Sequence, residues 1–268
     1  MTDSIKLSSP ATREFWEIPI LFEDEHLLAL DKPANVRLSP DRSEPQRVHL
    51  MKLLHAGIVE GKPWARQRQL AYLMNVHRLD FETGGVLLLA KNKPALIALA
   101  NLFGSDKPLL TCQALVQGAP NQASFEIDAP LAFHPVTPGL IQVDRIRGKR
   151  SRTRCELLET FSGYSLLQCR PLTGRPHQIR VHLQHHGLPV VGDSTYGGQP
   201  LLLSTLKSSF RLKPNRTERP LLSQAALHAT QLSFDHPVTG ETVTIKAPLP
   251  KDLNVALKYL RRYASVSA

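Results

Sequence analysis

The feature that most constrains the fold is a continuous apolar run, Gly-Gly-Val-Leu-Leu-Leu-Ala, at residues 84–90. A run of this length without polar alternation, bounded by glycines and by Lys91-Asn92, is typical of a strand buried on both faces. We therefore expect residues 84–90 to form a central strand of a sheet. The polar residues just before the run then lie at the end of that strand, where a loop can hold a side chain rigidly.

Short strand-like and helix-like patterns alternate along the chain, with no internal repeat and no Gly/Ser linker. This favours one mixed α/β domain over residues 15–264, after a polar tail at residues 1–14 that we expect to be flexible. Strands are also predicted at 18–22, 27–31, 113–117 and 165–169, and helices from Leu50 to a stop at Gly57, from Pro94 to a stop at Gly104, around 179–183, and at 253–260.

The charge balance points to a partner that carries phosphates. Thirty-three Lys and Arg against 23 Asp and Glu leave a formal charge of +10, which favours nucleic acid, although proteins that bind none can be equally basic. Cys112, Cys155 and Cys169 are too widely spaced for a disulfide framework or a metal knuckle and fit a reducing compartment. Because no secretory signal and no apolar stretch of roughly 18 residues is found, we expect a cytoplasmic protein without membrane contact.

A long polar segment at residues 198–220 is predicted to be a surface insertion. It carries five basic residues among Ser, Thr, Asn and Pro, namely Lys207, Arg211, Lys213, Arg216 and Arg219. Such a segment can be merely a solvated loop. Long basic loops within compact domains are more often functional, so the prediction is that this one faces RNA phosphates.

Two clusters of polar residues are the candidates for chemistry. The first, at residues 75–85, places Asp80 directly before the apolar strand, where it could be a rigidly held catalytic carboxylate or simply a turn residue before a glycine pair. The second, at residues 173–182, places Arg180 on a helix, where it could keep a buried acid ionised or could lie on an ordinary basic surface. Residue types alone leave both alternatives open.

Three segments resemble signatures of the RluA-like pseudouridine synthases, in the order in which that family carries them. They are VHRLDFETGGVLLLAKN, PLTGRPHQIRVHLQHHGLPVVGDSTYGG and ALHATQLSFDHPVTGETVTIKAPLPKDL. The opening segment LFEDEHLLALDKPANVRLSP is a weaker match, in which Asn35 replaces the usual glycine; because Asn tolerates positive φ, the turn can survive. The resemblance implies a largely antiparallel mixed sheet flanked by helices, with a central basic cleft.

The resemblance also implies roles for individual residues in isomerising uridine to pseudouridine in structured rRNA or tRNA. Asp80 matches the catalytic Asp, which attacks the ribose or takes its 2′ proton; Arg78 matches the Arg that enters the RNA stack as the uridine flips out. Arg180 matches the basic partner of the Asp, and Ile179 the pocket wall under the base. Arg175 and His177, in the same motif, are further candidates for substrate binding. The chemistry requires no cofactor.

One departure from the family motif motivates an alternative function. Where the family has Lys-x-Tyr-x-Ala, this chain has Leu110 and Cys112 before Ala114, and a thiol offers no ring face on which a base can stack. Tyr196 is a candidate for a neighbouring ring that could take the place of the missing tyrosine. The alternative is therefore a weakly active or non-catalytic RNA-binding relative, such as an RNA-folding or assembly factor.

A zinc site at His182 and His186, four residues apart on a helix, is rejected, because the HExxH carboxylate and a third ligand are missing. His77 and His228 are interpreted as hydrogen-bonded structural residues. We thus expect a monomer that binds RNA and no metal.

Overall fold

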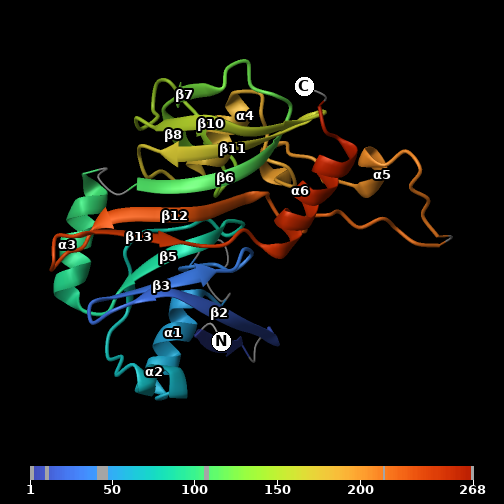
Figure 1. The fold of residues 1–268 in the computed structure, drawn as a ribbon. Coiled ribbons are helices and arrows are strands. Elements are labelled where there is room, and N and C mark those ends of the chain that lie inside the picture. Colours follow the sequence, from blue (N-terminus) through green and yellow to red (C-terminus); the bar gives the residue numbers. More distant parts are fainter. Residues whose placement is uncertain (1–2, 10–11, 41–47, 106–108, 214, 267–268) are drawn as a thin grey trace. The chain divides into compact units, whose positions relative to one another are not determined.

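The computed structural model describes residues 3–9, 12–40, 48–105, 109–213 and 215–266 (Figure 1). Its contacts divide the chain into two compact units. Unit 1 comprises residues 1–110 and 229–248, and unit 2 comprises residues 111–228 and 249–268. The expectation of one domain at residues 15–264 contained no such division, because none of the three boundaries, at 110/111, 228/229 and 248/249, coincides with a change in composition. Each unit is a mixture of largely antiparallel strands and helices, which confirms the expected α/β class.

Unit 1 is built on the strand that the sequence predicted to be central. β5 (Gly84–Ala90) is buried at every residue and lies beside β3 (Leu27–Lys32), which pairs with β2 (Glu14–Glu23). On its other side β5 adjoins β12 (Leu227–Asp235), which pairs with β13 (Thr242–Lys246), and the two-residue β4 (Met74–Asn75) also pairs with β5. The apolar run is therefore the middle of the sheet.

The N-terminal segment corrects one expectation. Residues 4–9, within the predicted flexible tail, form β1 (Ser4–Ser9), which pairs antiparallel with β2. Ile5 and Leu7 alternate with exposed residues and are buried. That period of two is short and lies among Ser, Lys and Asp, so composition concealed it.

The helices of unit 1 are α1 (Leu50–Val59), α2 (Pro63–Gln67) and α3 (Lys93–Gly104). α3 matches the predicted helix, and Asn92 caps it by accepting a 2.9 Å hydrogen bond from the amide of Ala95. α1 corrects the prediction of a stop at Gly57, since it continues to Val59. A Cβ at Gly57 would lie 2.3 Å from the Trp64 ring, so this glycine permits close packing inside the helix.

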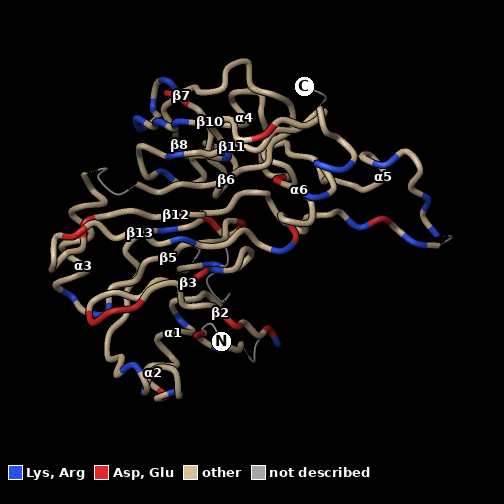
Figure 2. The backbone as a smooth tube through the Cα atoms, viewed as in Figure 1, with Lys and Arg blue, Asp and Glu red and all other residues tan. Residues whose placement is uncertain are grey.

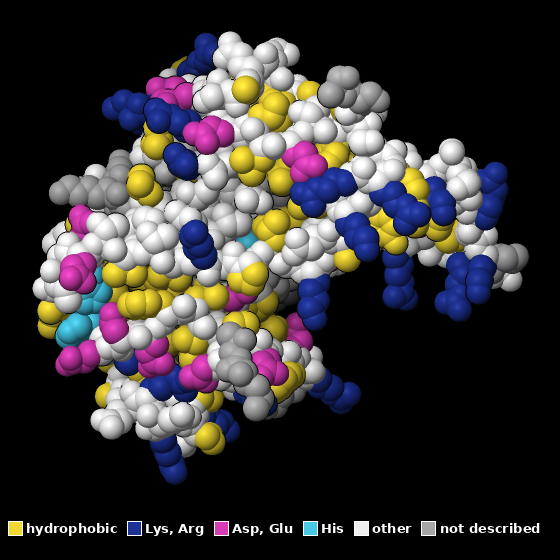
Figure 3. All heavy atoms as spheres, viewed as in Figure 1, with side chains coloured by type: hydrophobic (Ala, Val, Ile, Leu, Met, Phe, Trp, Pro, Cys, Tyr) yellow, Lys and Arg dark blue, Asp and Glu magenta, His cyan; other side chains and the backbone are white. Residues whose placement is uncertain are grey.

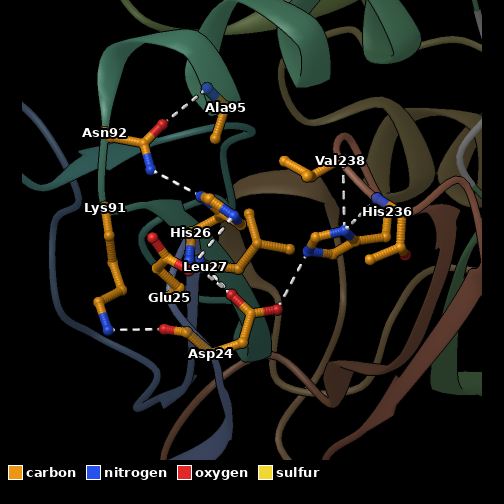
Figure 4. Close-up of polar contacts among 10 residues, drawn as sticks. Asp24, Glu25, His26, Leu27, Lys91, Asn92, Ala95, His236 and Val238 are labelled. Carbon is orange, nitrogen blue, oxygen red and sulfur yellow. Dashed lines mark hydrogen bonds and ion pairs between the residues drawn. The ribbon is translucent and has the colours of Figure 1, made fainter.

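Two hairpin turns of unit 1 are joined by a carboxylate and an imidazole (Figure 4). Asp24 Oδ1 accepts hydrogen bonds from the amides of His26 and Leu27, both at 2.7 Å, which form the turn between β2 and β3. Asp24 Oδ2 lies 3.0 Å from Nε2 of His236, whose Nδ1 accepts from the amide of Val238. Nδ1 therefore acts as an acceptor and Nε2 carries the proton. His236 is thus structural.

Unit 2 contains an antiparallel sheet in the order β6 (Leu109–Gln117), β11 (Tyr164–Pro171), β10 (Arg152–Phe161) and β7 (Ser124–Asp128). A separate hairpin is formed by β8 (Leu131–Phe133) and β9 (Ile141–Val143). Helix α4 (Gln178–His185) packs against β10 and β11, and the 3-10 turn η1 (Ser194–Tyr196), α5 (Leu203–Leu206) and α6 (Lys251–Tyr263) complete the unit. Among the described residues, no helix is long and apolar enough to cross a membrane.

Candidate active site

Asp80 lies half-buried in the loop between β4 and β5, and the glycine pair after it fixes where that loop ends. Gly85 has φ +110°, and a Cβ there would lie 2.1 Å from the carbonyl oxygen of Ala229 on β12. Only glycine fits both the backbone conformation and this close approach. The start of β5 is thereby pressed against β12, which gives the loop a rigid anchor.

A buried lysine holds the same loop from beneath. Lys32, at the end of β3, is 0% exposed, and its Nζ donates hydrogen bonds to the carbonyl oxygens of Pro33 (3.1 Å), Asp80 (3.3 Å) and Thr83 (2.8 Å). Burial lowers the pKa of Lys32 to about 7, against the opposing effect of the Asp80 and Glu82 carboxylates. Lys32 therefore positions the backbone of Asp80 and supplies positive charge close to its carboxylate.

The turn after β3 is tied to the Asp80 loop as well. The amide of Asn35 donates a 2.7 Å hydrogen bond to the carbonyl oxygen of Phe81. Asn35 has φ +59°, the conformation that the family's glycine would adopt, so the expectation that Asn preserves this turn is confirmed.

The two residues before Leu79, His77 and Arg78, differ in their surroundings. Burial lowers the pKa of His77 to about 4; its Nε2 accepts from the amide of Leu88 at 3.0 Å, and its ring stacks on Phe103 with centroids 5.3 Å apart. His77 is therefore neutral and structural, as the sequence indicated. Arg78, by contrast, is exposed.

In unit 2, Arg180 on α4 is 0% exposed and binds Asp193 in a bidentate ion pair. Its Nε lies 2.7 Å from Oδ2 and its Nη2 2.8 Å from Oδ1 of that carboxylate, which is itself 2% exposed. The guanidinium carbon lies 4.9 Å from the centroid of the Tyr196 ring. Such a buried cation is held in place because leaving it without a counter-charge would be costly.

Tyr196, whose ring lies against the Arg180 guanidinium, is itself held by hydrogen bonds. It is 7% exposed, and its hydroxyl oxygen lies 2.7 Å from Nδ1 of His177 and accepts from the amide of Ile141 at 3.1 Å. With 7% of its surface exposed and the Arg180 guanidinium over its ring, Tyr196 is packed as a supporting residue of unit 2. These contacts do not favour Tyr196 as a substitute for the stacking tyrosine that the resemblance implies.

The loop before α4 is organised by a glutamine that the sequence analysis did not single out. Gln178 Oε1 accepts from the hydroxyl of Thr173 (2.8 Å) and the amide of Arg175 (3.1 Å), while its Nε2 donates to the carbonyl of Arg152 (2.8 Å). His177, at the N-cap, has φ +52°, and Arg175 remains exposed. The buried Ile179 follows on the first turn of the helix.

Cys112 occupies an interior position on β6, with 2% of its surface exposed. It lies opposite Cys169 on β11, which in turn lies opposite Cys155 on β10. The Sγ atoms of Cys155 and Cys169 are 3.6 Å apart. The thiol at residue 112, where the resemblance implies a tyrosine, is thus one of three thiols in a row across neighbouring strands.

His182 is bound on both sides of its ring, which explains its place in the motif. Nδ1 lies 2.9 Å from the hydroxyl of Thr153 and Nε2 2.9 Å from the carbonyl of Ala129. His186 stacks on Phe125, with ring centroids 4.6 Å apart. These contacts support the structural interpretation of both histidines.

The structure thus brings the predicted residues together in two groups, except for Cys112, the other candidate for substrate binding, which lies on β6. Arg78 and Asp80 share a loop of unit 1, and Ile179 and Arg180 share a helix of unit 2 with Arg175 and His177 just before it. The pairing of Asp80 with Arg180 stays a prediction. Three supporting residues were missed, although Lys32 and Asp193 lie in the quoted motifs ALDKP and GDSTYGG and Gln178 in GRPHQIR.

Comparison with known proteins identifies the fold and the family. The model of the RNA pseudouridylate synthase family matches residues 26–185, a span that includes both groups of residues. The chain belongs to this family. Its members are isomerases that convert uridine to pseudouridine in RNA, so the chain is an enzyme of the isomerase class.

Relatives of this family match nearly the whole chain. The chain is 34% identical to ribosomal large subunit pseudouridine synthase D of Zymomonas mobilis, over 97% of this chain and 78% of the relative. It is 36% identical to ribosomal large subunit pseudouridine synthase C of Yersinia pestis, over 92% and 70%. The solved structure of human RNA pseudouridylate synthase domain containing 4 matches with a TM-score of 0.66 and 22% identity, over 93% of this chain and 94% of that one, and shows the shared fold.

We expect the stability difference between the wild type and Lys32→Met to depend on pH. With a folded-state pKa of about 7 and an unfolded value near 10.5, Lys32 takes up a proton on unfolding between these values. The wild type should therefore gain stability relative to the variant as pH rises above 7, by up to about 1.4 kcal/mol per unit. Urea unfolding at pH 7, 8 and 9 measures this, with the exposed Lys52→Met as control. A pH-independent difference would mean that the carbonyls keep Lys32 charged throughout.

We expect Asp193→Asn to destabilise unit 2 by about 3–5 kcal/mol, because the variant keeps the shape of the side chain but leaves a buried guanidinium without its counter-charge. Glu159→Gln is the matched control, since Glu159 pairs with Arg261 on the surface, where the loss should stay below about 1 kcal/mol. Urea unfolding curves of both variants provide the comparison. Equal losses would show that burial adds nothing to the Arg180–Asp193 pair.

Proposed function

We propose that this enzyme isomerises uridine to pseudouridine in structured RNA, with Asp80 as its catalytic carboxylate. The observation that carries the proposal is the family match at residues 26–185, which spans the loop of Asp80 and the helix of Arg180. The anchoring of the Asp80 loop by Lys32, Asn35 and Gly85 supports it, because a reacting carboxylate must be held in a defined position. Asp80 acts by attacking the ribose or by taking its 2′ proton.

The proposed substrate is rRNA of the large ribosomal subunit, with tRNA as the other class of structured RNA. Both similar bacterial relatives carry the large ribosomal subunit in their names, which favours the first. The reaction would then take place in the cytoplasm. That the enzyme is a monomer, that it needs no metal and that a basic cleft holds the RNA are further parts of the proposal.

In the proposed reaction the uridine leaves the RNA stack before the chemistry begins. Arg78, exposed two residues before Asp80, enters the vacated position and offsets part of the unstacking cost. The glycosidic bond from C1′ to N1 breaks, the uracil turns, and a bond from C1′ to C5 forms; C5 gives up its proton to solvent and N1 takes one up, so the product is an isomer of the substrate. Arg180 is the proposed basic partner of Asp80, Ile179 forms the apolar wall under the base, and Arg175 and His177 contact the RNA.

The proposal predicts that Asp80→Ala and Asp80→Asn abolish isomerisation while RNA binding survives. Both variants remove the reacting carboxylate, and both make the protein less negative, which favours binding to a polyanion. Release of tritium from RNA labelled at uridine C5 measures the reaction, and filter binding measures affinity. Glu82→Gln, which removes a neighbouring carboxylate of the same loop, is the control and should remain active. Loss of RNA binding by a folded Asp80→Asn protein would contradict the assignment.

The alternative function, a non-catalytic or weakly active RNA-binding relative, is motivated by Cys112 at the position of the family's tyrosine. A pure binder has no evident use for a rigidly held carboxylate, which favours the enzyme. Tritium release that is absent from every RNA pool, with binding intact, would favour the binder instead.

We expect Cys112→Tyr to raise the rate of tritium release if the site otherwise follows the family. A ring at this position would stack on the target base, an interaction of about 1–3 kcal/mol. The control is Cys155→Ser, which changes another thiol of the same row. A slower Cys112→Tyr protein with an unchanged unfolding midpoint would show that the site is built around the thiol.

A further inference from the structure

The basic segment at residues 198–220, here called the arm, is tied together at its base. The amide of Leu221 donates a 2.8 Å hydrogen bond to the carbonyl of Leu201, and Glu218 Oε1 accepts one of 2.8 Å from the amide of Ser204. Figure 1 shows the arm running out beyond α5 and returning along a second leg. The arm is therefore an extension with a defined root on unit 2.

The arm carries charge that the protein leaves unneutralised. Its five cations and one acid give +4. Arg211, Lys213, Arg216 and Arg219 are exposed, and none forms an ion pair with any residue that the structure describes. Lys and Arg follow both legs in Figure 2, and Figure 3 shows their side chains projecting into solvent. Like charges placed this closely repel one another, so a polyanion would relieve them.

Helix α6 extends this basic surface within unit 2. α5, at the root of the arm, packs against α6, and Nζ of Lys207 lies 5.7 Å from the centroid of the Tyr263 ring. Arg262 lies over the same ring at 5.3 Å. The helix contributes four cations and one acid, or +3, so the arm and α6 together carry +7 of the chain's +10.

The composition of the arm distinguishes among polyanionic partners. A membrane-binding segment needs a continuous apolar face to insert. In the arm Leu212 is exposed, at 45%, whereas Leu202, Leu203, Leu206 and Phe210 are half-buried. An exposed row of flexible cations fits a chain of phosphates, where each contact releases a condensed counterion. Nucleic acid matches this chemistry better than a lipid surface.

We propose that the arm and α6 form an accessory RNA-binding surface that contacts backbone phosphates of the substrate outside the target nucleotide, without regard to base sequence. The inference rests on the proposed function for the identity of the RNA as substrate. In this proposal the arm and α6 contribute to RNA affinity and take no part in the isomerisation itself.

The test removes three arm charges, by Lys213→Gln, Arg216→Gln and Arg219→Gln, from a chain that also carries Asp80→Asn, so that no turnover takes place. Binding of a fluorophore-labelled, mixed-sequence RNA hairpin is measured by anisotropy as a function of salt. We expect Kd to rise about tenfold or more, and the slope of log K against log salt to become shallower by about 2 to 3. The matched control removes three exposed lysines of unit 1, by Lys52→Gln, Lys93→Gln and Lys246→Gln, and should change both quantities little.

Unchanged Kd and slope in the arm variant would overturn the proposal, as would an equal loss in the control, which would reflect net charge alone. Loss of binding to phosphatidylglycerol vesicles, with RNA binding intact, would assign the surface to membranes and also overturn it. Because the assay uses a chain that cannot turn over, its outcome is independent of tritium release. Failure of the arm and failure of the isomerase are therefore distinguishable.

Discussion

A buried ammonium group beneath a loop organises the candidate chemistry of unit 1. Lys32 has no exposed surface, and its three hydrogen bonds go to backbone carbonyls, two of them in the Asp80 loop. Backbone acceptors fix the course of the chain rather than one side-chain rotamer, so Lys32 determines where the loop runs. The Asp80 and Glu82 carboxylates raise the pKa of Lys32, while its burial lowers that pKa more strongly, to about 7. Lys32 thus both fixes the backbone of the Asp80 loop and interacts electrostatically with the carboxylates of that loop.

In unit 2 an ion pair, rather than hydrogen bonds to backbone carbonyls, holds the charged group in place. Arg180 is presented by a helix, fully buried, and held in a fork by Asp193 with the Tyr196 ring beneath it. A bidentate carboxylate fixes the plane of a guanidinium as well as its charge. The two units therefore each hold one charged group with little freedom, and each does so through residues that touch no substrate in the proposed reaction.

The sequence predicted the elements whose periodicity is strong and the residues that the family motifs name. β5 was found from its apolar run and α3 from its cap and spacing, and Asn35 was expected to adopt positive φ. β1 was missed because its alternation covers only six residues. The predicted stop at Gly57 was wrong because this glycine makes room for the Trp64 ring inside the helix, a contact that the residue pattern does not reveal. The sequence did not identify Lys32, Gln178 and Asp193 as supporting residues, because their roles also depend on tertiary contacts. A supporting residue is recognised by what it touches, which spacing does not encode.

The thiol at residue 112, where the resemblance to the family implies a tyrosine, bears on how the proposed RNA substrate is held. Cys112 belongs to a row of buried thiols with Cys169 and Cys155, in which the hydrogen bond with Cys155 together with burial raises the pKa of the Cys169 thiol. A lost stacking ring removes about 1–3 kcal/mol of base binding. Counterion release at physiological salt gives about 1 kcal/mol for each phosphate contact. Two or three contacts along the arm would then be of the size needed to offset the missing ring. This links Cys112 to the arm cations that form no ion pair with the residues the structure describes. It predicts that Cys112→Tyr relieves part of the defect of the arm variant in RNA binding.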